Sequence, residues 1–210
     1  MDAERPDPGE ELNRSGEPTR PRQAATVIVL RGGDETLEVL MVRRNPRQRF
    51  MGGAWVFPGG AVDADEGEGD AAHRLAGVRE VQEEAGLTLP DPGALVKLSR
   101  WITPAEVKIR FDTHFFLAEA PAGQEARADG SECVDLGWFT PQGALDAYAR
   151  DDMTLVFPTI RTLEQLAPFP SAAELLGWAA GRVVVPVKPR VLMHGEMARI
   201  VLPGEPGYEA

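Results

Sequence analysis

The sequence is poor in several kinds of feature, and each shortage narrows what the chain can be. It holds one cysteine, Cys133, in 210 residues, so no disulfide can form within the chain, which is compatible with a reducing compartment. No apolar run approaches the roughly 20 residues that a membrane span requires, and the N-terminus has no apolar signal core. We therefore expect a soluble, cytoplasmic protein without a membrane partner.

Basic residues are also scarce. Lysine and arginine number 22 against 33 aspartates and glutamates, which gives a formal net charge of -11. Because a nucleic-acid groove needs a concentrated basic surface, the composition argues against a nucleic-acid partner. Small phosphorylated ligands stay open, since metal ions can reverse the field of an acidic site. The length suits one domain with an ample core and an appendage.

Acidic residues are abundant, and three of them gather in one short segment. Residues 79–87 read REVQEEAGL and predict part of a helix that carries Glu80, Glu83 and Glu84. At about 100° per residue, these side chains share one narrow face. Like charges at this spacing destabilise a helix by about 0.2 to 0.5 kcal/mol per pair, which indicates a bound cation. Oxygen ligands on one rigid element suit Mg²⁺ or Mn²⁺ and not zinc.

The residues around this cluster favour a metal site over a solvated acidic face, which is the commoner explanation for an isolated E-x-x-E-E pattern. Residues 54–57 (AWVF) predict a strand that runs into a glycine loop at residues 58–60, and the acidic helix follows. Arg79 can hold one carboxylate by bidentate hydrogen bonds. Gly86 is placed to end the helix in the left-handed conformation.

Residues 79–87 resemble the second half of the Nudix box. The box reads Gly, five residues, Glu, seven residues, then Arg-Glu-apolar-any-Glu-Glu-any-Gly-apolar, and every specified position of its second half is matched. The first half fits at Gly60 and Glu66, but twelve residues separate Glu66 from Arg79 where the box has seven. We infer an insertion of five residues, with residues 64–70 as an acidic, glycine-rich loop, which leaves the role of Glu66 open.

The resemblance implies a fold, a reaction and a set of site residues. The fold is α/β, a Nudix α/β/α sandwich with a mixed β-sheet. The reaction is metal-dependent hydrolysis of the diphosphate linkage between a nucleoside diphosphate, the small-molecule partner, and a group X. Its implied cofactor is Mg²⁺ or Mn²⁺, with Glu80, Glu83 and Glu84 as metal ligands. The implied catalytic residues are Arg79, Glu83, Glu84 and Glu132, and Glu132 is a metal ligand, the base or a surface carboxylate.

Segments outside the box resemble one branch of the family, the coenzyme A diphosphatases that include nucleoside diphosphate-linked moiety X motif nineteen. They are residues 49–63 (RFMGGAWVFPGGAVD), 101–104 (WITP), 110–118 (RFDTHFFLA) and 202–208 (LPGEPGY). The branch tolerates an insertion within the box. It implies coenzyme A or acyl-CoA as substrate, with 3′,5′-ADP and (acyl-)4′-phosphopantetheine as products. The alternatives are an ADP-ribose or NADH diphosphatase and a non-catalytic ligand-binding Nudix module.

An arginine cluster precedes the glycine loop, in residues 43–49 (RRNPRQR). The planar fork of arginine suits phosphate groups, so we predict that these side chains bind substrate, although a solvated loop is the alternative. The predicted substrate-binding residues are Arg44, Arg47, Arg49, Gly59 and Gly60. Arg47 and Arg49 are the candidates for the 3′-phosphate of coenzyme A.

The chain is expected to divide into three parts of one domain. Residues 1–23 predict a disordered tail, residues 24–140 the Nudix core, and residues 141–210 a helical extension with terminal strands that shapes the pocket or a homodimer interface. Strands are predicted at 24–30, 37–42, 54–57, 95–103, 110–118, 132–139, 183–187 and 198–202, and C-terminal helices at 141–150, 159–166 and 172–181. On the strand at 110–118, His114 is a candidate pocket residue, although a structural role is more usual.

Overall fold

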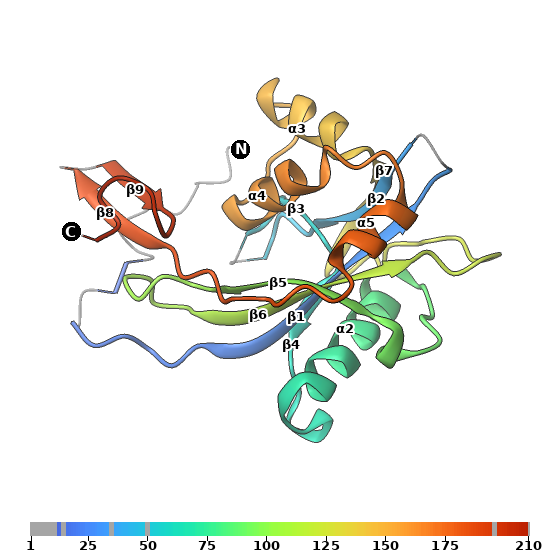
Figure 1. Ribbon diagram of the computed structural model, residues 1–210, viewed down its shortest axis with the longest axis horizontal. Coiled ribbons are helices and arrows are strands. Elements are labelled where there is room, and N and C mark those ends of the chain that lie inside the picture. Colours follow the sequence, from blue (N-terminus) through green and yellow to red (C-terminus); the bar gives the residue numbers. More distant parts are fainter. Residues whose placement is uncertain (1–11, 14–15, 34–35, 49–50, 195–196, 210) are drawn as a thin grey trace.

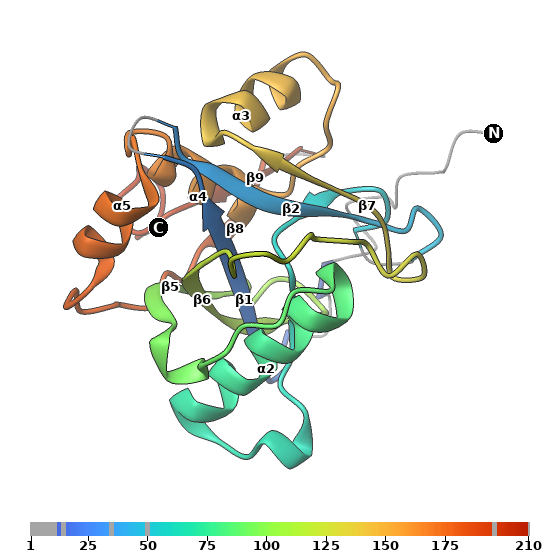
Figure 2. The same ribbon diagram turned by 90° about the vertical axis from the view of Figure 1, so that its right-hand side faces the viewer.

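The computed structural model describes residues 12–13, 16–33, 36–48, 51–194 and 197–209. Among these residues the chain forms the α/β/α sandwich that the sequence predicts. One long helix, α2 (Gly69–Ala85), covers one face of the central sheet, whereas α3 (Pro141–Ala149), α4 (Phe157–Leu166) and α5 (Ala172–Ala179) cover the other (Figure 1; Figure 2). The fold class is therefore confirmed.

The central sheet is mixed. Its strands are β1 (Arg22–Arg31), β2 (Glu38–Arg44), β3 (Trp55–Val56), β4 (Gly59–Ala61), β5 (Val96–Ile102), β6 (Phe111–Glu119) and β7 (Cys133–Phe139). The order is β3-β2-β1-β6-β5, with β4 paired to β1 and β7 paired to β2. Strands β1 and β6 run parallel, and the other pairs are antiparallel. Short 3-10 turns, η1 (Ala64–Glu66) and η2 (Pro92–Ala94), flank α2.

Strand β1 is buried on both faces, because each face packs against its own helical layer. Ala25, Val27 and Val29 belong to the core beneath α2, whereas Ile28 and Leu30 belong to the core beneath α3, α4 and α5. This alternation explains why the strand reads as a continuous apolar run.

Helix α2 lies unusually close to β1 at Gly77. A Cβ atom at this position would stand 2.7 Å from Val27 Cγ2, so only glycine allows the approach. The helix ends at Gly86, which has φ 67° and donates its backbone N–H to the carbonyl oxygen of Gln82, and this confirms the predicted helix end.

Two local predictions are wrong. The predicted glycine loop contains β4, whose Gly59 and Gly60 pair with β1. The predicted strand at 183–187 contributes only an isolated bridge between Val187 and Trp101, because Pro186 has no N–H to donate and interrupts any ladder. The terminal strands are instead β8 (Arg190–His194) and β9 (Met197–Val201), which form a separate antiparallel hairpin.

The predicted tail over residues 1–23 falls partly on residues 1–11 and 14–15, which lie outside the described residues. In its described part, Leu12 forms an isolated bridge with Val107. Strand β1 begins at Arg22, two residues before the predicted start, because Arg22 and Gln23 extend the parallel register with β6.

Candidate active site

A cavity of about 1250 Å³ joins the acidic half of α2 to the C-terminal hairpin. At one end it is lined by Glu80 and Glu84 of α2 and by Gly59 and Gly60 of β4. These elements meet because β4 pairs with β1, over which α2 packs. Because of this packing, two of the three box glutamates, Glu80 and Glu84, line the same cavity.

The two glycines of β4 are engaged by carboxylates of the protein itself. Gly59 donates its backbone N–H to Glu84 Oε2 at 3.0 Å. Gly60 lies directly beneath the Glu80 carboxylate, and a Cβ atom there would overlap with Glu80 Oε1. Both glycines also line the cavity, so the carboxylates beside them lie where a ligand would meet them.

Arg79 binds most of the neighbouring acids at once. Its Nη1 donates to Glu80 Oε1 at 2.7 Å and to Glu83 Oε2 at 3.0 Å, and its Nη2 donates to the carbonyl oxygen of Ala61 at 2.9 Å. Burial alone would lower the pKa of this guanidinium, but hydrogen bonds to Glu66 and Glu80 raise the pKa above its usual value. Arg79 thereby fastens α2 to β4.

Glu66 reaches the site although the sequence spacing between it and Arg79 departs from the box. Glu66 Oε1 lies 3.0 Å from Arg79 Nε, and Glu66 Oε2 accepts the backbone N–H of Asp63 at 2.7 Å. The inserted residues form the turn η1 and the first residues of α2, so the segment predicted as a loop is partly helical. The insertion is absorbed before Arg79, and the contact between box residues survives.

Glu84 is a buried carboxylate with few partners. Its exposed fraction is 3%. Burial, with the charge of Glu80, raises its pKa to about 7 despite the hydrogen bond from Gly59. The thiol of Cys133, which is buried in the core as expected, also bonds this carboxylate, and burial raises the pKa of that thiol.

Like charges accumulate around Glu80 as well. Burial raises the pKa of Glu80, Arg79 opposes this shift, and the charges of Glu83 and Glu132 add to it. Glu132 lines the cavity from an exposed position just before β7. Asp129 accepts the backbone N–H groups of Glu132 and Cys133, which fixes this segment at the cavity wall.

A hard divalent cation fits this donor set. Glu80, Glu84 and Glu132 all line the cavity, and burial raises the pKa values of Glu80 and Glu84, so a bound cation would stabilise their charged forms. Among the residues that the structure describes, no three His, Cys, Asp or Glu side chains already form a metal cage. Arg79 holds Glu83 outside the cavity lining, and 58% of the Glu83 side chain is exposed.

The predicted substrate-binding arginines separate in space. Arg44 lines the cavity, and its buried Nε has no hydrogen-bond partner within the described part of the chain. Arg47 is exposed and does not line the cavity, and Arg49 lies outside the described residues. Gln48 was missed by the sequence analysis, although it lines the cavity with a buried Oε1 that has no partner among the described residues. Its only signal was its place within the arginine cluster.

The far end of the cavity is apolar. Trp101 and Phe111 of the sheet, Phe157 of α4, and Val191 and Ile200 of the hairpin line it. The C-terminal extension therefore shapes the cavity, one of the two roles that the sequence suggested for it.

His114 faces away from this cavity, although it was a candidate pocket residue. Its ring stacks on His73 of α2 with the ring centroids 3.8 Å apart, on the opposite side of the sheet from Phe115 and Thr113. The structural role is therefore the correct one. No helix in the described ranges is both long and apolar enough to span a bilayer.

Comparisons with known proteins show which chains this one resembles. A family model described as NUDIX domain matches residues 20–159. The acyl-coenzyme A diphosphatase NUDT19 of Homo sapiens is 23% identical across 91% of this chain and 81% of its own. A putative 8-oxo-dGTP diphosphatase of Bacillus subtilis is 34% identical across 57% of this chain and 66% of its own. The crystal structure of a NUDIX hydrolase from Alicyclobacillus acidocaldarius has a TM-score of 0.70 at 28% identity, covering 76% of this chain and 96% of that one.

Proposed function

The chain belongs to the NUDIX domain family and is a Nudix hydrolase, and from this premise we propose that its substrate is coenzyme A or an acyl-coenzyme A. The products would be 3′,5′-ADP and 4′-phosphopantetheine or its acyl form. The similarity to a human acyl-coenzyme A diphosphatase supports this choice at low identity.

One observation carries the proposal: a single cavity combines a carboxylate end with an apolar end. Its volume of about 1250 Å³ exceeds the roughly 300 to 1,000 Å³ of common small-molecule sites, which favours a long substrate. The apolar lining suits both the pantetheine arm with its acyl group and the adenine ring, because burial of apolar surface stabilises binding. ADP-ribose and NADH carry polar groups where coenzyme A carries the pantetheine arm, so the apolar lining stabilises their binding less.

Nudix hydrolases generally use divalent metal ions, and we propose Mg²⁺ or Mn²⁺ here, held by Glu80 and Glu84, with Glu83 completing the set after release from Arg79. When bound, the metal neutralises the diphosphate and lowers the pKa of water. Arg79 and the glycines of β4 hold the carboxylates in place before the substrate arrives. This preorganisation reduces the cost of assembling the site.

Glu132 is our candidate for the residue that takes the proton from water. It lines the cavity from an exposed position, so it can pass the proton to solvent, whereas Glu84 is closed off from solvent. The water oxygen forms a new P–O bond as one P–O bond of the diphosphate bridge breaks, and the bridging oxygen leaves on the other phosphate. Arg44 lines the same cavity, and its guanidinium, whose buried Nε has no hydrogen-bond partner among the described residues, is our candidate to bind a phosphate oxygen.

A hydrolysis panel tests the proposal. Purified protein is incubated with Mg²⁺ or Mn²⁺ and coenzyme A, acyl-CoA esters, ADP-ribose, NADH or 8-oxo-dGTP, and the products are separated by chromatography. We expect 3′,5′-ADP from coenzyme A and its esters at the highest kcat/KM. Preferred release of AMP from ADP-ribose or NADH would assign those substrates instead.

A matched pair of variants separates an enzyme from a ligand-binding module or a contaminant. Glu84→Gln removes a cavity carboxylate, whereas Asp70→Asn removes a carboxylate at the start of the same helix that lies outside the cavity. Turnover that is lost only in Glu84→Gln supports catalysis by this site. Turnover that persists unchanged in Glu84→Gln contradicts it. The cytoplasmic location and the homodimer stay predictions.

A further inference from the structure

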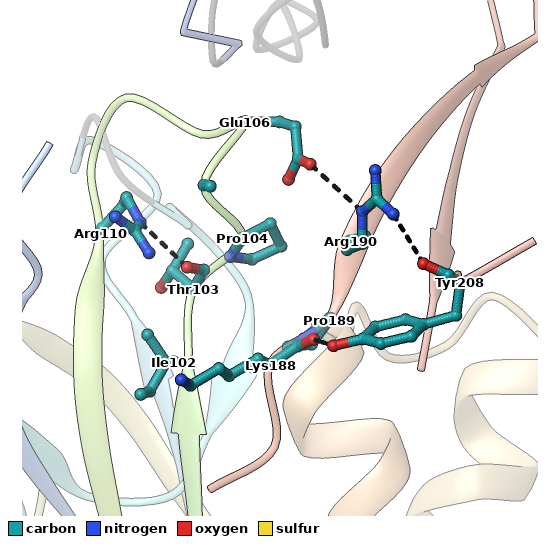
Figure 3. A pocket seen from close by; sticks show the side chains of 10 residues that line it. Ile102, Thr103, Pro104, Glu106, Arg110, Lys188, Pro189, Arg190 and Tyr208 are labelled. Carbon is teal, nitrogen blue, oxygen red and sulfur yellow. Dashed lines mark hydrogen bonds and ion pairs between the residues drawn. The ribbon is translucent and has the colours of Figure 1, made fainter. Parts of the chain in front are cut away.

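A second, smaller cavity of about 320 Å³ lies between the β5–β6 turn and the start of β8 (Figure 3). Four of its lining residues, Ile102, Thr103, Pro104 and Pro189, also line the active-site cavity. The two cavities are therefore neighbours that share part of their lining.

The chain builds this small cavity by docking its C-terminal segment on the edge of the sheet. Val187 accepts the N–H of Ile102 at 2.9 Å and donates its own to the carbonyl oxygen of Arg100 at 2.8 Å. The next residue, Lys188, is held by the hydroxyl of Tyr208, which donates to the Lys188 carbonyl oxygen at 2.8 Å. These contacts fix the backbone of Lys188 beside the β5–β6 turn.

Positive charge prevails in this cavity, which we call the cation pocket after Arg110, Lys188 and Arg190. Among the described lining residues, these three cations face one carboxylate, Glu106, so that part of the lining has a formal excess of two positive charges. The protein as a whole carries a formal charge of -11. A local excess of the opposite sign in so acidic a chain indicates a site for an anion.

Within the described residues, two of these cations form no ion pair with an acid. Arg110 donates its Nε to the carbonyl oxygen of Thr103 at 3.0 Å and its Nη1 to that of Thr19 at 2.6 Å, and both acceptors are neutral. The Lys188 side chain extends toward Ile102 (Figure 3), and it has no ion pair with any described residue. Arg190 lies 3.9 Å from Glu106 and donates to the carbonyl oxygen of Tyr208.

We propose that the cation pocket binds a phosphate monoester carried by the substrate that occupies the active-site cavity. A phosphate monoester carries a charge of about -1.5 to -2 at neutral pH, which matches the excess of the lining. The inference rests on the proposed function, because the 3′-phosphate of coenzyme A is such a group. It moves recognition of that phosphate from Arg47, which lies outside the cavity lining, to Lys188 and Arg110.

A kinetic comparison tests the proposal. Coenzyme A and 3′-dephospho-coenzyme A, which differ only in this phosphate, are assayed with wild type and with Lys188→Ala. We expect Lys188→Ala to raise KM for coenzyme A about fivefold to tenfold, as loss of one charge-assisted contact predicts, with kcat unchanged and the dephospho substrate unaffected. Lys108→Ala is the control, because Lys108 is an exposed lysine outside both linings. An equal effect on both substrates, or the same effect from Lys108→Ala, overturns the proposal.

A binding measurement separates failure of this proposal from failure of the proposed function. Affinities for 3′,5′-ADP, 5′-AMP and inorganic phosphate are measured by titration calorimetry without turnover. Tighter binding of 3′,5′-ADP than of AMP that is lost in Lys188→Ala supports the pocket even if coenzyme A is not hydrolysed. Equal affinity for the two nucleotides overturns it even if coenzyme A is hydrolysed. Lys188-dependent binding of inorganic phosphate alone would assign the pocket to a free anion and also overturns it.

Discussion

The two halves of α2 treat charge in opposite ways. In the first half, Asp70 bonds Arg74 Nε and Lys97 Nζ, each at 2.6 Å. In the second half, Arg79 alone donates hydrogen bonds to Glu66, Glu80 and Glu83. One acid has two bases at one end of the helix, whereas at the other end four acids share one base, since Asp63 Oδ2 also lies 3.6 Å from Arg79 Nε.

The pKa values of one acid from each half shift in opposite directions. Although burial raises it, the hydrogen bonds from Lys97 and Arg74 lower the pKa of Asp70 to about 2. Burial and the charge of Glu80 raise the pKa of Glu84 to about 7. The first half is electrostatically complete and stabilises the fold, while the second half is short of positive charge. A site that binds a cation has this character in its free state.

The largest effect is expected from removing a cavity carboxylate. Glu84→Gln should lower kcat by about 10³-fold, within the range for loss of a group that acts on the reacting centre. Asp70→Asn should leave kcat within about twofold, because Asp70 lies outside the cavity lining and acts on the fold. Steady-state assays at saturating metal measure both, and equal losses would contradict the division of the helix.

The pH dependence of stability should have opposite signs at the two ends. The folded pKa of Glu84 lies above its usual value of 4.5, so the free energy of unfolding of the metal-free protein falls as pH rises from about 4.5 to about 7. Glu84→Gln removes this loss. The difference in free energy of unfolding between the variant and wild type should therefore favour the variant more at pH 8 than at pH 4, by at most about 3 kcal/mol.

Asp70 provides the counterpart. Its folded pKa is below its usual value of 3.8, so its stabilising contribution is present above that pH and disappears as pH falls through about 2. Asp70→Asn should therefore destabilise the protein at pH 7 and have a much smaller effect at pH 2. Urea unfolding across this pH range checks both variants, and parallel pH curves for the two would refute the assignment.

Replacing Arg79 in the second half of α2 should mainly lower kcat, whereas replacing Arg74 in the first half should mainly lower stability. Arg79→Lys keeps the charge but loses the fork that binds several carboxylates and a carbonyl oxygen, so we expect kcat to fall about tenfold to a hundredfold. Arg74→Lys should affect kcat little and lower the melting temperature by a few degrees. Kinetics and thermal unfolding of both variants decide, and an unchanged kcat in Arg79→Lys would count against its positioning role.

Alanine in place of a helix-facing or site-facing glycine should give the smallest effects. In Gly60→Ala, the new Cβ displaces the flexible Glu80 carboxylate, so we expect kcat/KM to fall about tenfold with little change in stability. In Gly77→Ala, the Cβ presses on Val27 in the core, which should cost about 1 to 3 kcal/mol of stability with kcat retained. The reverse pattern would contradict the contacts of both glycines.

Much of the fold was predictable, because local sequence patterns are enough to predict individual helices and strands. The alternation along β6 and the cap at Thr140 that opens α3 gave their elements with small errors in bounds. The terminal region was predicted less well, since the apolar run at 183–187 forms no strand and β8 was missed. Pairing of a short terminal hairpin depends on the partner strand and on docking against β5, which no local period encodes.

By itself, the sequence determined that a helix carries three glutamates and an arginine at spacings suited to a hard cation, because helical geometry follows from local contacts. Only the tertiary structure decided that Glu66 reaches Arg79 across an insertion, that Glu83 and Arg47 stay outside the cavity lining, and that Lys188 stands beside the active-site cavity. The reason is that these relations depend on loop closure and on packing between segments far apart in the chain, which a local period leaves open.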